Sequence, residues 1–240
     1  MITLTINGKQ YTAEEGQNLL QAALDNGIEI PHLCYHEKLS PYGGCRLCLV
    51  EITKGKKTTM TTSCTYPAAE GIQVQTDTPQ VRKARRLVME LILPMAPNSP
   101  RIQALAGELG VERSRFTFEG DGCIKCGLCI RACEELVGAG TITFSGKGPE
   151  RKVKPPFDEE PVHCLGCAAC VYICPTGCIQ MDDLGRKRRI DRWKKTLKMK
   201  KCKECSRPYI PVEQIEYFLQ RTADSDLTAE WFEVCPDCRQ

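Results

Sequence analysis

Cysteine carries the strongest chemical signal in this sequence, because 17 of the 240 residues are cysteines and their spacing is regular. One of them, Cys178, stands apart from the others. The rest form four quartets: Cys34, Cys45, Cys48 and Cys64; Cys123, Cys126, Cys129 and Cys133; Cys164, Cys167, Cys170 and Cys174; and Cys202, Cys205, Cys235 and Cys238. The odd count, and a start without a basic segment followed by an apolar one, argue against a secreted disulfide framework. We therefore expect reduced thiols in a cytoplasmic protein, most of them metal ligands.

The second and third quartets share the spacing Cys-x2-Cys-x2-Cys-x3-Cys, which holds cubane clusters in two-cluster ferredoxins. In that motif three closely spaced thiolates bind one cubane, and the fourth cysteine binds the other. The duplicated spacing makes merely buried or zinc-bound cysteines a much weaker alternative. It predicts two crossed ligand sets: Cys123, Cys126, Cys129 and Cys174 for the first [4Fe–4S] cluster, and Cys164, Cys167, Cys170 and Cys133 for the second.

The first quartet has the close central pair and distant fourth cysteine of plant-type [2Fe–2S] ferredoxins, although its first gap is ten residues instead of four. Gly43 and Gly44 let the loop backbone approach a cluster and donate amide hydrogen bonds to it. Zinc is the competing interpretation. Because strands are expected on both sides of the loop, we predict that Cys34, Cys45, Cys48 and Cys64 bind a [2Fe–2S] cluster.

The last quartet consists of two Cys-x2-Cys pairs separated by 29 residues. Two such pairs present four thiolates tetrahedrally, which suits a structural zinc ion. Cys202, Cys205, Cys235 and Cys238 are therefore predicted Zn²⁺ ligands, and a rubredoxin-like iron or a further iron–sulfur cluster is the alternative.

Four other residues could ligate metal but are assigned no ligand role. His32 and His36 flank Cys34, and His163 precedes Cys164. Because every predicted cluster already has four cysteines, we interpret the histidines as surface groups or as groups that contact ligands. We interpret Cys178 as a buried, packed thiol.

The first 77 residues are predicted to form a small sheet packed on one helix. Apolar residues alternate in 2–6, and Asn7-Gly8 is a strong hairpin signal. A helical stretch opens at Glu14-Glu15 and closes at Asn26-Gly27. Further strands are expected over 28–30, 47–52, 57–62 and 72–76.

The remaining chain divides into three parts. Thr78 as N-cap and Pro79 predict a helix over 78–93, and a second helix follows Ser99-Pro100 and stops at Gly110, so 78–119 is a helical linker. Two short helices and a strand at 141–144 are expected in 120–184, which contains both cubane runs. Residues 185–240 are predicted to be a basic linker followed by the Cys-x2-Cys metal knuckle.

The charge pattern singles out 186–203, which has eleven Lys or Arg and one acidic residue, Asp191, in a chain whose net charge is +3. Nucleic-acid binding is one reading of this segment. No recognised nucleic-acid-reading module accompanies it, so we expect instead a basic helical linker that lies on an acidic partner surface. The sequence has no apolar run of 18 residues, so no membrane span is predicted. No phosphate-binding or catalytic motif is recognised in it.

Several segments resemble the iron–sulfur domains shared by the large iron–sulfur subunit of respiratory complex I, NAD-linked formate dehydrogenases, the diaphorase small subunit of NAD-reducing hydrogenases, and [FeFe] hydrogenases. The segments are 15–20, 30–35 and 44–51 in the first domain, and 123–129, 137–140 and 170–177 in the cubane domain. The resemblance covers about residues 1–183. It implies an α+β chain with a β-grasp [2Fe–2S] domain, a helical linker and a two-[4Fe–4S] ferredoxin-like domain, to which the sequence adds a zinc-ribbon-like C-terminal module.

The resemblance also implies a function. Members of this family act as electron-transfer subunits beside a flavin-containing, NAD(P)H-oxidising subunit, and deliver electrons to a catalytic reductase, hydrogenase or formate dehydrogenase subunit. Electron bifurcation and either direction of flow are compatible with it. Relatives usually have a cubane with one His and three Cys ligands between the two domains, and 94–101 contains none of these ligands. The rival hypotheses are a metal-stabilised nucleic-acid-binding protein and a self-sufficient iron–sulfur reductase.

Overall fold

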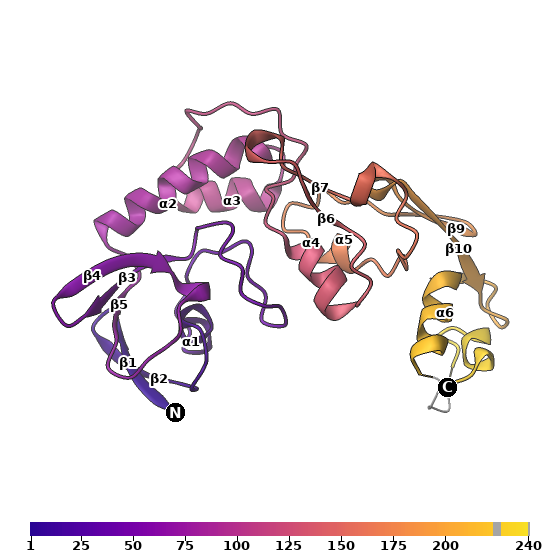
Figure 1. Ribbon diagram of the computed structural model, residues 1–240, viewed down its shortest axis with the longest axis horizontal. Helices are drawn as coiled ribbons and strands as arrows, with labels where there is room; N and C mark the ends of the chain where they lie inside the picture. Colours follow the sequence, from indigo (N-terminus) through magenta and orange to yellow (C-terminus); the bar gives the residue numbers. More distant parts are fainter. Residues whose placement is uncertain (223–226, 240) are drawn as a thin grey trace. The chain divides into compact units, whose positions relative to one another are not determined.

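The computed structural model describes residues 1–222 and 227–239, which divide into two compact units, 1–128 and 129–240. The first unit contains a five-stranded mixed sheet of order β2-β1-β5-β3-β4 (Figure 1). Strands β1 (Ile2–Ile6) and β5 (Gln73–Gln75) are parallel, and all other pairs are antiparallel. The remaining strands are β2 (Lys9–Ala13), β3 (Leu49–Lys54) and β4 (Lys57–Thr62).

The predicted hairpin at Asn7-Gly8 is confirmed. Ile6 pairs with Lys9, and Asn7 and Gly8 both have positive φ, at 51° and 81°. Positive φ at both central residues is the geometry of a type I′ turn, whose twist matches that of the strands it joins.

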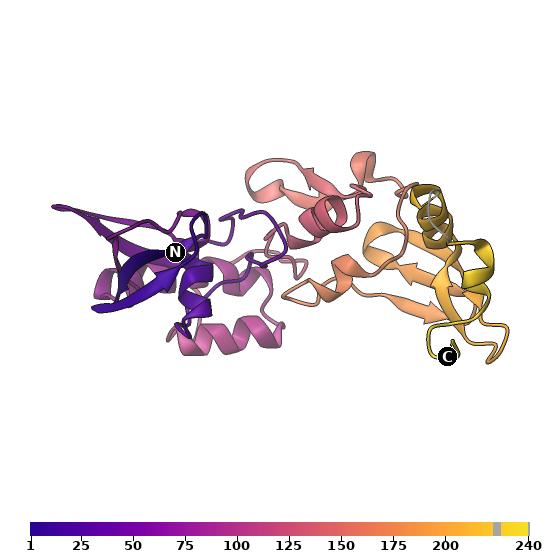
Figure 2. The same ribbon diagram turned by 90° about the horizontal axis from the view of Figure 1, so that it is seen from below.

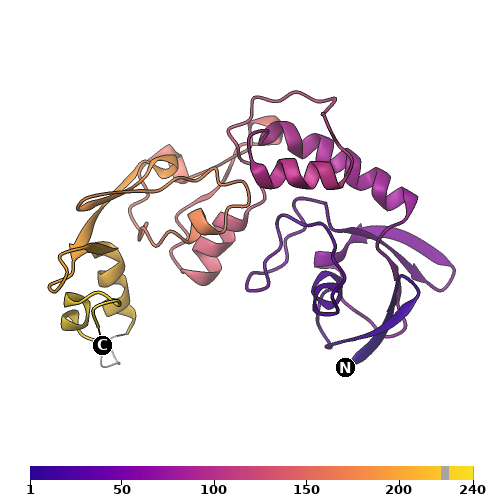
Figure 3. The ribbon, with the colours of Figure 1, turned by 180° about the vertical axis from the view of Figure 1, so that it is seen from behind.

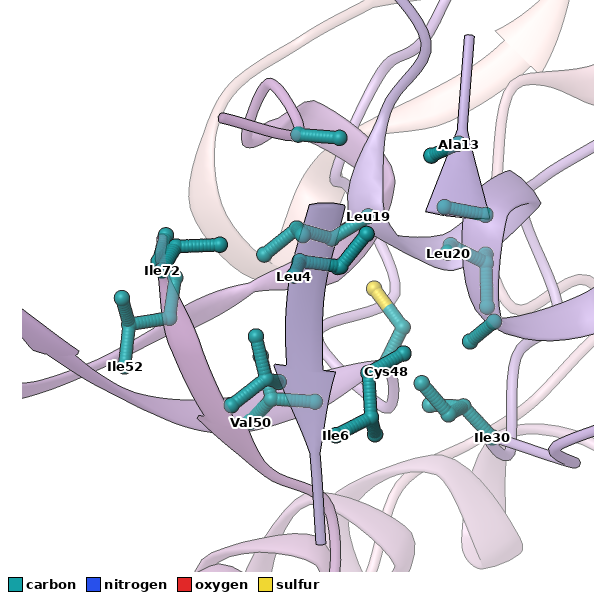
Figure 4. Packing of buried hydrophobic residues seen from close by; sticks show 14 of the residues in the cluster. Leu4, Ile6, Ala13, Leu19, Leu20, Ile30, Cys48, Val50, Ile52 and Ile72 are labelled. Carbon is teal, nitrogen blue, oxygen red and sulfur yellow. The ribbon is translucent and has the colours of Figure 1, made fainter. Parts of the chain in front are cut away.

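Helix α1 (Leu19–Asp25) packs its apolar side on the sheet. Figure 4 shows Leu4 and Ile6 of β1, Leu19 and Leu20 of α1, and Val50 of β3 gathered in one cluster that also includes Cys48. Because Cys48 is part of this close-packed core, the core fixes the backbone that carries it.

Two details of this unit differ from the sequence prediction. The helix begins at Leu19 and not at Glu14, because Gly16 has a φ of 85° and the Asn18 side chain caps the helix by accepting a bond from the Gln21 amide at 2.9 Å. Residues 28–30 do not form a strand. Their backbone turns away from the helix, with the Ile28 amide donating to the Ala23 carbonyl at 2.8 Å.

The predicted helical segment is confirmed as α2 (Pro79–Ile92) and α3 (Pro100–Glu108), joined through the 3-10 turn η2 (Leu93–Met95). Thr78 caps α2, with its hydroxyl accepting from the Val81 amide at 3.1 Å. The two helices lie side by side in Figures 1 and 3, and α2 also packs against β3.

The second unit begins with short elements that surround cysteines. Helix α4 (Leu128–Arg131) continues into the π-helical turn η3 (Ala132–Leu136), which contains Cys133 and packs against α5 (Ala169–Tyr172). Strands β6 (Thr143–Ser145) and β7 (Lys152–Lys154) form a two-stranded ladder, close to the predicted strand at 141–144. Two single 3-10 turns complete the connections of this part, η4 (Gly148–Glu150) and η5 (Pro156–Asp158). In the first unit, the 3-10 turn η1 (Ser63–Thr65) follows β4.

The basic segment is not helical, and that prediction is wrong. It forms β9 (Lys187–Ile190), the turn η6 (Asp191–Trp193) and β10 (Lys195–Lys201), in an antiparallel sheet of order β11-β10-β9-β8. The physical reason is a period of two: Lys195, Leu197 and Met199 are buried while Thr196 and Lys198 are exposed. Strand β8 (Asp182–Leu184) joins the same sheet, so pairing crosses the predicted domain boundary at 184/185, which stays a prediction.

The sheet is completed by β11 (Pro208–Pro211) and covered by α6 (Val212–Arg221), which packs against β10 and β11 (Figure 2). The last 3-10 turn, η7 (Ala229–Glu233), packs on α6. Among the helices of the described residues, none has the length and apolar character needed to cross a membrane.

Candidate iron–sulfur and metal centres

The first quartet lies in one buried site of the first unit. Cys34 and Cys45 belong to the long loop after α1, Cys48 directly precedes β3, and Cys64 lies in η1 after β4. All four are buried, and Ser63 fixes the Cys48 backbone by donating to its carbonyl from both the amide (2.9 Å) and the hydroxyl (2.8 Å). The structure therefore brings together the four residues that the sequence predicts as [2Fe–2S] ligands.

The four thiols of this site are linked by hydrogen bonds. Cys34 accepts from the side chains of Cys45 and Cys64 and from the Cys45 amide at 3.4 Å, and these bonds lower its pKa to about 2. A bond from Cys64 lowers the pKa of Cys48 to about 7, while the pKa values of the donors Cys45 and Cys64 are raised because they hold the shared protons. Thiolate is the form that binds metal, so this site is suited to hold a cluster once the shared protons leave.

The glycines of this loop have the roles that their position requires. Gly43 has a φ of 68°, and a Cβ on Gly44 would lie 2.4 Å from the Tyr42 ring. The Gly44 backbone also contributes a hydrogen bond that lowers the pKa of Cys34. A side chain at Gly44 would therefore require the Tyr42 ring to move.

A buried arginine lies beneath this site and was not predicted from the sequence. Arg85 of α2 is 5% exposed, and its Nη2 donates to the Leu49 carbonyl, directly after Cys48, at 2.6 Å. Within the part of the chain that the structure describes, its Nε has no hydrogen-bond partner. Burial lowers its pKa, and the charges of Asp77 and Cys48 oppose that shift. A buried cation requires compensating negative charge, which anionic thiolates and their cluster would supply.

A second site lies wholly in the second unit. Cys133 from η3 and Cys164, Cys167 and Cys170 line one small cavity, together with Ile142, Leu165, Ile190 and Trp193. Burial raises the pKa values of Cys164 and Cys167, and raises that of Cys170 to about 12 against the effect of a hydrogen bond from Trp193. Four convergent thiols in an apolar cavity are a donor set that fits an iron–sulfur cluster.

Cys133 is far from Cys164 in sequence, and η3 and the loop after it position it. Its carbonyl accepts from the amides of Ala139 at 2.9 Å and Gly140 at 3.2 Å. Its Sγ lies 3.4 Å from the Thr141 hydroxyl. The crossed arrangement that the spacing predicts for the second cubane thus corresponds to residues that share one cavity.

The other predicted cubane set has members in both units, with Cys123 and Cys126 in the first and Cys129 and Cys174 in the second. Its assignment stays a prediction. Cys123 accepts from the Lys125 amide at 3.4 Å, and Lys125 has a φ of 55°, so the backbone curls around this thiol.

Cys178 is not the fully buried thiol that the sequence suggests. It is partly exposed, and its Sγ lies 3.6 Å from that of Cys174. The hydrogen bond between these two thiols, together with burial, raises the pKa of Cys174, and a hydrogen bond from Thr176 opposes that shift.

The four tail cysteines form a compact site of their own. Their sulfur atoms all lie within 4.8 Å of one another, and Cys205 Sγ lies 3.9 Å from Cys235 Sγ. The first pair follows β10 and the second follows η7, and the Cys235 amide donates to Cys202 Sγ at 3.3 Å. That bond is the main cause of lowering the pKa of Cys202 to about 6, whereas proton sharing with Cys235 raises that of Cys238 to about 12.

The histidines take part in no cluster of thiols within the described ranges. His32 Nδ1 lies 2.8 Å from the Ile30 carbonyl, and His36 Nδ1 accepts from the Lys38 amide at 3.2 Å. His163 lines a surface pocket with Glu213 and Tyr217, next to Cys164. Their interpretation as groups that are not ligands stays a prediction.

Comparison with known proteins finds two domain families in this chain. Residues 1–79 match a 2Fe-2S iron-sulfur cluster binding domain, and residues 117–181 match a 4Fe-4S dicluster domain. The tail quartet lies outside both matched ranges.

Curated relatives match across both domains. The chain is 32% identical over 205 residues to a subunit of the NADH-quinone oxidoreductase of Rickettsia prowazekii, covering 75% of this chain and 30% of that protein. It is 33% identical over 202 residues to the alpha subunit of the NADPH-Fe(3+) oxidoreductase of Geobacter sulfurreducens, covering 74% of this chain and 24% of that protein. The chain thus spans less than a third of the length of these relatives.

A solved structure is also similar. A chain of the NAD⁺-reducing [NiFe]-hydrogenase in its H₂-reduced state has a TM-score of 0.58 and 28% sequence identity, covering 65% of this chain and 75% of the hydrogenase chain.

Proposed function

Because the chain belongs to the family of iron–sulfur electron-transfer domains present in these oxidoreductase subunits, we propose that it is the iron–sulfur electron-transfer subunit of a multi-subunit NAD(P)H-linked oxidoreductase. It takes electrons from a flavin-containing, NAD(P)H-oxidising subunit and passes them to a catalytic reductase, hydrogenase or formate dehydrogenase subunit. The observation that carries this proposal is the gathering of the cysteines into two separate thiol sites. The first quartet forms a buried site, and Cys133 with Cys164, Cys167 and Cys170 forms a half-buried one around a small cavity.

The residues that would hold the groups are those of the predicted sets. Cys34, Cys45, Cys48 and Cys64 hold a [2Fe–2S] cluster, whose loop amides and Arg85 balance its negative charge. Cys164, Cys167, Cys170 and Cys133 hold one [4Fe–4S] cluster, and Cys123, Cys126, Cys129 and Cys174 hold the other. When bound, these groups supply one-electron storage, and the chain itself contributes thiolates, amide donors and exclusion of water.

The chain carries no recognised site for nicotinamide, flavin or substrate, so it acts as a relay between partners that have those sites. Electron bifurcation is compatible with this role, since cluster potentials span a wide range. The abundance of reduced cysteines is typical of a cytoplasmic protein.

The tail quartet is proposed to bind one structural zinc ion. Four Zn–S bonds of about 2.3 Å in a tetrahedron separate the sulfurs by roughly 3.8 Å, which matches the 3.9 Å between Cys205 and Cys235. A cubane would hold its four cysteine sulfurs further apart. With all four positions taken by thiolates, the ion has no open site for chemistry.

Nucleic-acid binding is less favoured because several basic residues of 186–203 form ion pairs with carboxylates of this chain. Arg188 pairs with Asp183 at 2.8 Å, and Arg189 pairs with Asp191 at 2.8 Å. Three lysines have carboxylate partners as well: Lys195 with Glu160, and Lys200 and Lys203 with Glu233.

The proposed function is tested by reductive titration of the anaerobically purified chain, followed by paramagnetic resonance. We expect dithionite to reduce one slowly relaxing [2Fe–2S] centre and faster relaxing [4Fe–4S] centres, because both kinds are bound. NADH alone should leave the spectra unchanged, and NADH with the flavin subunit should reduce them. Protein without reducible iron would contradict the proposal, and direct reduction by NADH would favour a self-sufficient reductase.

A further inference from the structure

The cavity of the second proposed cubane is closed by a residue from the tail sheet. Trp193 lies in η6, between β9 and β10, and is 1% exposed. Its indole Nε1 donates to Cys170 Sγ at 3.3 Å. Trp193 lies beyond the matched dicluster domain, which ends at residue 181. The segment after the matched domain, here called the tail (182–240), therefore supplies the indole N–H that donates to Cys170, a predicted ligand within that domain.

The turn that carries Trp193 is held by backbone hydrogen bonds. Ile190 pairs with Lys195 across the hairpin, and the Lys194 amide donates to the Asp191 carbonyl at 2.9 Å. Lys194 has a φ of 53°, which reverses the chain directly after the tryptophan. A second hydrogen bond joins the same sheet to the loop that contains Cys164 and Cys167, since Arg188 Nη1 donates to the Gly166 carbonyl at 2.8 Å. These contacts of the sheet fix the backbone that carries Trp193, and so they position the indole at Cys170.

Two cations near this cavity have carboxylate partners. Arg188 is paired with Asp183 through two bonds of 2.8 Å. Lys195 is 7% exposed, and its Nζ lies 3.0 Å from Glu160. An indole N–H is a donor only and has no counter-ion, so its dipole acts on the Cys170 thiolate without such compensation. Neutral donors also serve the other ligands, from Thr141 to Cys133 and from the Gly166 and Ala169 amides to Cys164 and Cys167.

We propose that Trp193 raises the reduction potential of the [4Fe–4S] cluster held by Cys133, Cys164, Cys167 and Cys170, through its N–H···S bond to Cys170. The inference rests on the proposed function, and adds that the tail sheet sets the driving force of one relay step. The reduced cluster holds one electron more than the oxidised one, and part of that charge lies on the ligand sulfurs. A hydrogen bond to a more negative acceptor is stronger, so the N–H stabilises the reduced form. The electron comes from the reductant, and the proton stays on the indole nitrogen.

The test is Trp193→Phe, which keeps an aromatic ring in the cavity and removes the donor. The chain has one other tryptophan, Trp231, which is 53% exposed and stacks with Arg239, so Trp231→Phe is the matched control. Potentiometric titration of each loaded protein with dithionite, followed by paramagnetic resonance, gives the midpoint of each centre. We expect Trp193→Phe to lower one [4Fe–4S] midpoint, so that the reduced-to-oxidised ratio at a fixed potential falls several-fold, up to about tenfold or about 59 mV for a one-electron couple. Trp231→Phe should leave every midpoint in place.

A second readout reports the bond itself. Hyperfine spectra of the reduced protein in H₂O and D₂O should contain the exchangeable proton of the indole in addition to those of Thr141 and of the Gly166 and Ala169 amides. Trp193→Phe should remove that one proton, and Trp231→Phe should retain it. If Trp193→Phe keeps its iron and all midpoints, the inference is overturned while the proposed function stands. If the unmodified chain has no [4Fe–4S] signal at all, the proposed function itself fails. Where Trp193→Phe loses iron, the unmodified protein labelled with ¹⁵N at the tryptophan indole decides, and the absence of a hyperfine coupling to that nitrogen overturns the inference.

Discussion

Replacing Cys133 with alanine is expected to damage the cluster held by Cys164, Cys167 and Cys170. The cluster of Cys123, Cys126 and Cys129, which precede Cys133 in the same sequence motif, should be spared. The reason is that Cys133 lines the cavity of Cys164, Cys167 and Cys170. Loss of that cubane would lower the iron content from about ten to about six atoms per chain, with the [2Fe–2S] signal unchanged. Iron analysis and paramagnetic resonance of the purified variant measure both effects.

The control for this variant is Cys178→Ala, which removes a cysteine outside the predicted sets and should keep all iron. The identity of the lost cluster is read from a double variant. If the second cubane is the one lost, adding Trp193→Phe to Cys133→Ala changes no remaining midpoint. A surviving [4Fe–4S] centre that still responds to Trp193→Phe would mean that each run closes its own cluster, contrary to the crossed assignment.

Replacing Cys235 with serine is expected to release the tail metal ion and to open the segment 202–239 to protease, while the iron content stays at about ten. Structural zinc contributes on the order of 10 kcal/mol to folding of small modules, and the tail has few other buried residues to replace it. The tail is otherwise held by contacts such as the Tyr209 hydroxyl bond to the Phe232 carbonyl at 2.6 Å. Metal analysis with limited proteolysis tests both parts, and Ser206→Ala is a control beside the same knuckle.

The same site should lose its metal on acidification. Cys202 has a pKa lowered to about 6 by the Cys235 amide, so its thiolate is present at neutral pH and is protonated as the pH falls through that value. Protonation competes with metal binding, and Cys238, whose pKa is raised to about 12, must already give up a proton at neutral pH. The apparent affinity therefore falls as the pH falls, and it falls more steeply below about pH 6, where Cys202 also takes up a proton. Iron that titrates with reductant in place of zinc would contradict the structural role and make the tail a further relay.

The parts of this structure that local chemistry determines could be predicted from the sequence. The Asn7-Gly8 turn and the Thr78-Pro79 helix start depend on neighbouring residues only, and both are confirmed. The cysteine spacings predict which thiols share a cubane because three of its ligands stand at short, fixed intervals and the fourth comes from the other copy of the motif.

Features that depend on tertiary register were missed. The basic segment is predicted to be a helical linker on the basis of its charge. The alternation of Leu197 and Met199 with more exposed residues indicates a strand, but it extends over few residues and is a weak signal. Trp193 reaches Cys170 only through the β9–β10 hairpin, which no local pattern predicts. Arg85 gave a usable hint, since it stands four residues from both Val81 and Met89, on the buried face of α2.

The most direct test of the central claim is the metal and sulfide content of the anaerobically purified chain. We predict about ten iron atoms and about ten acid-labile sulfides, with about one zinc ion, because one [2Fe–2S] and two [4Fe–4S] clusters are bound beside a four-thiolate zinc site. A reproducible content of about six iron atoms would contradict this claim, because one of the cubane sites would then hold no cluster.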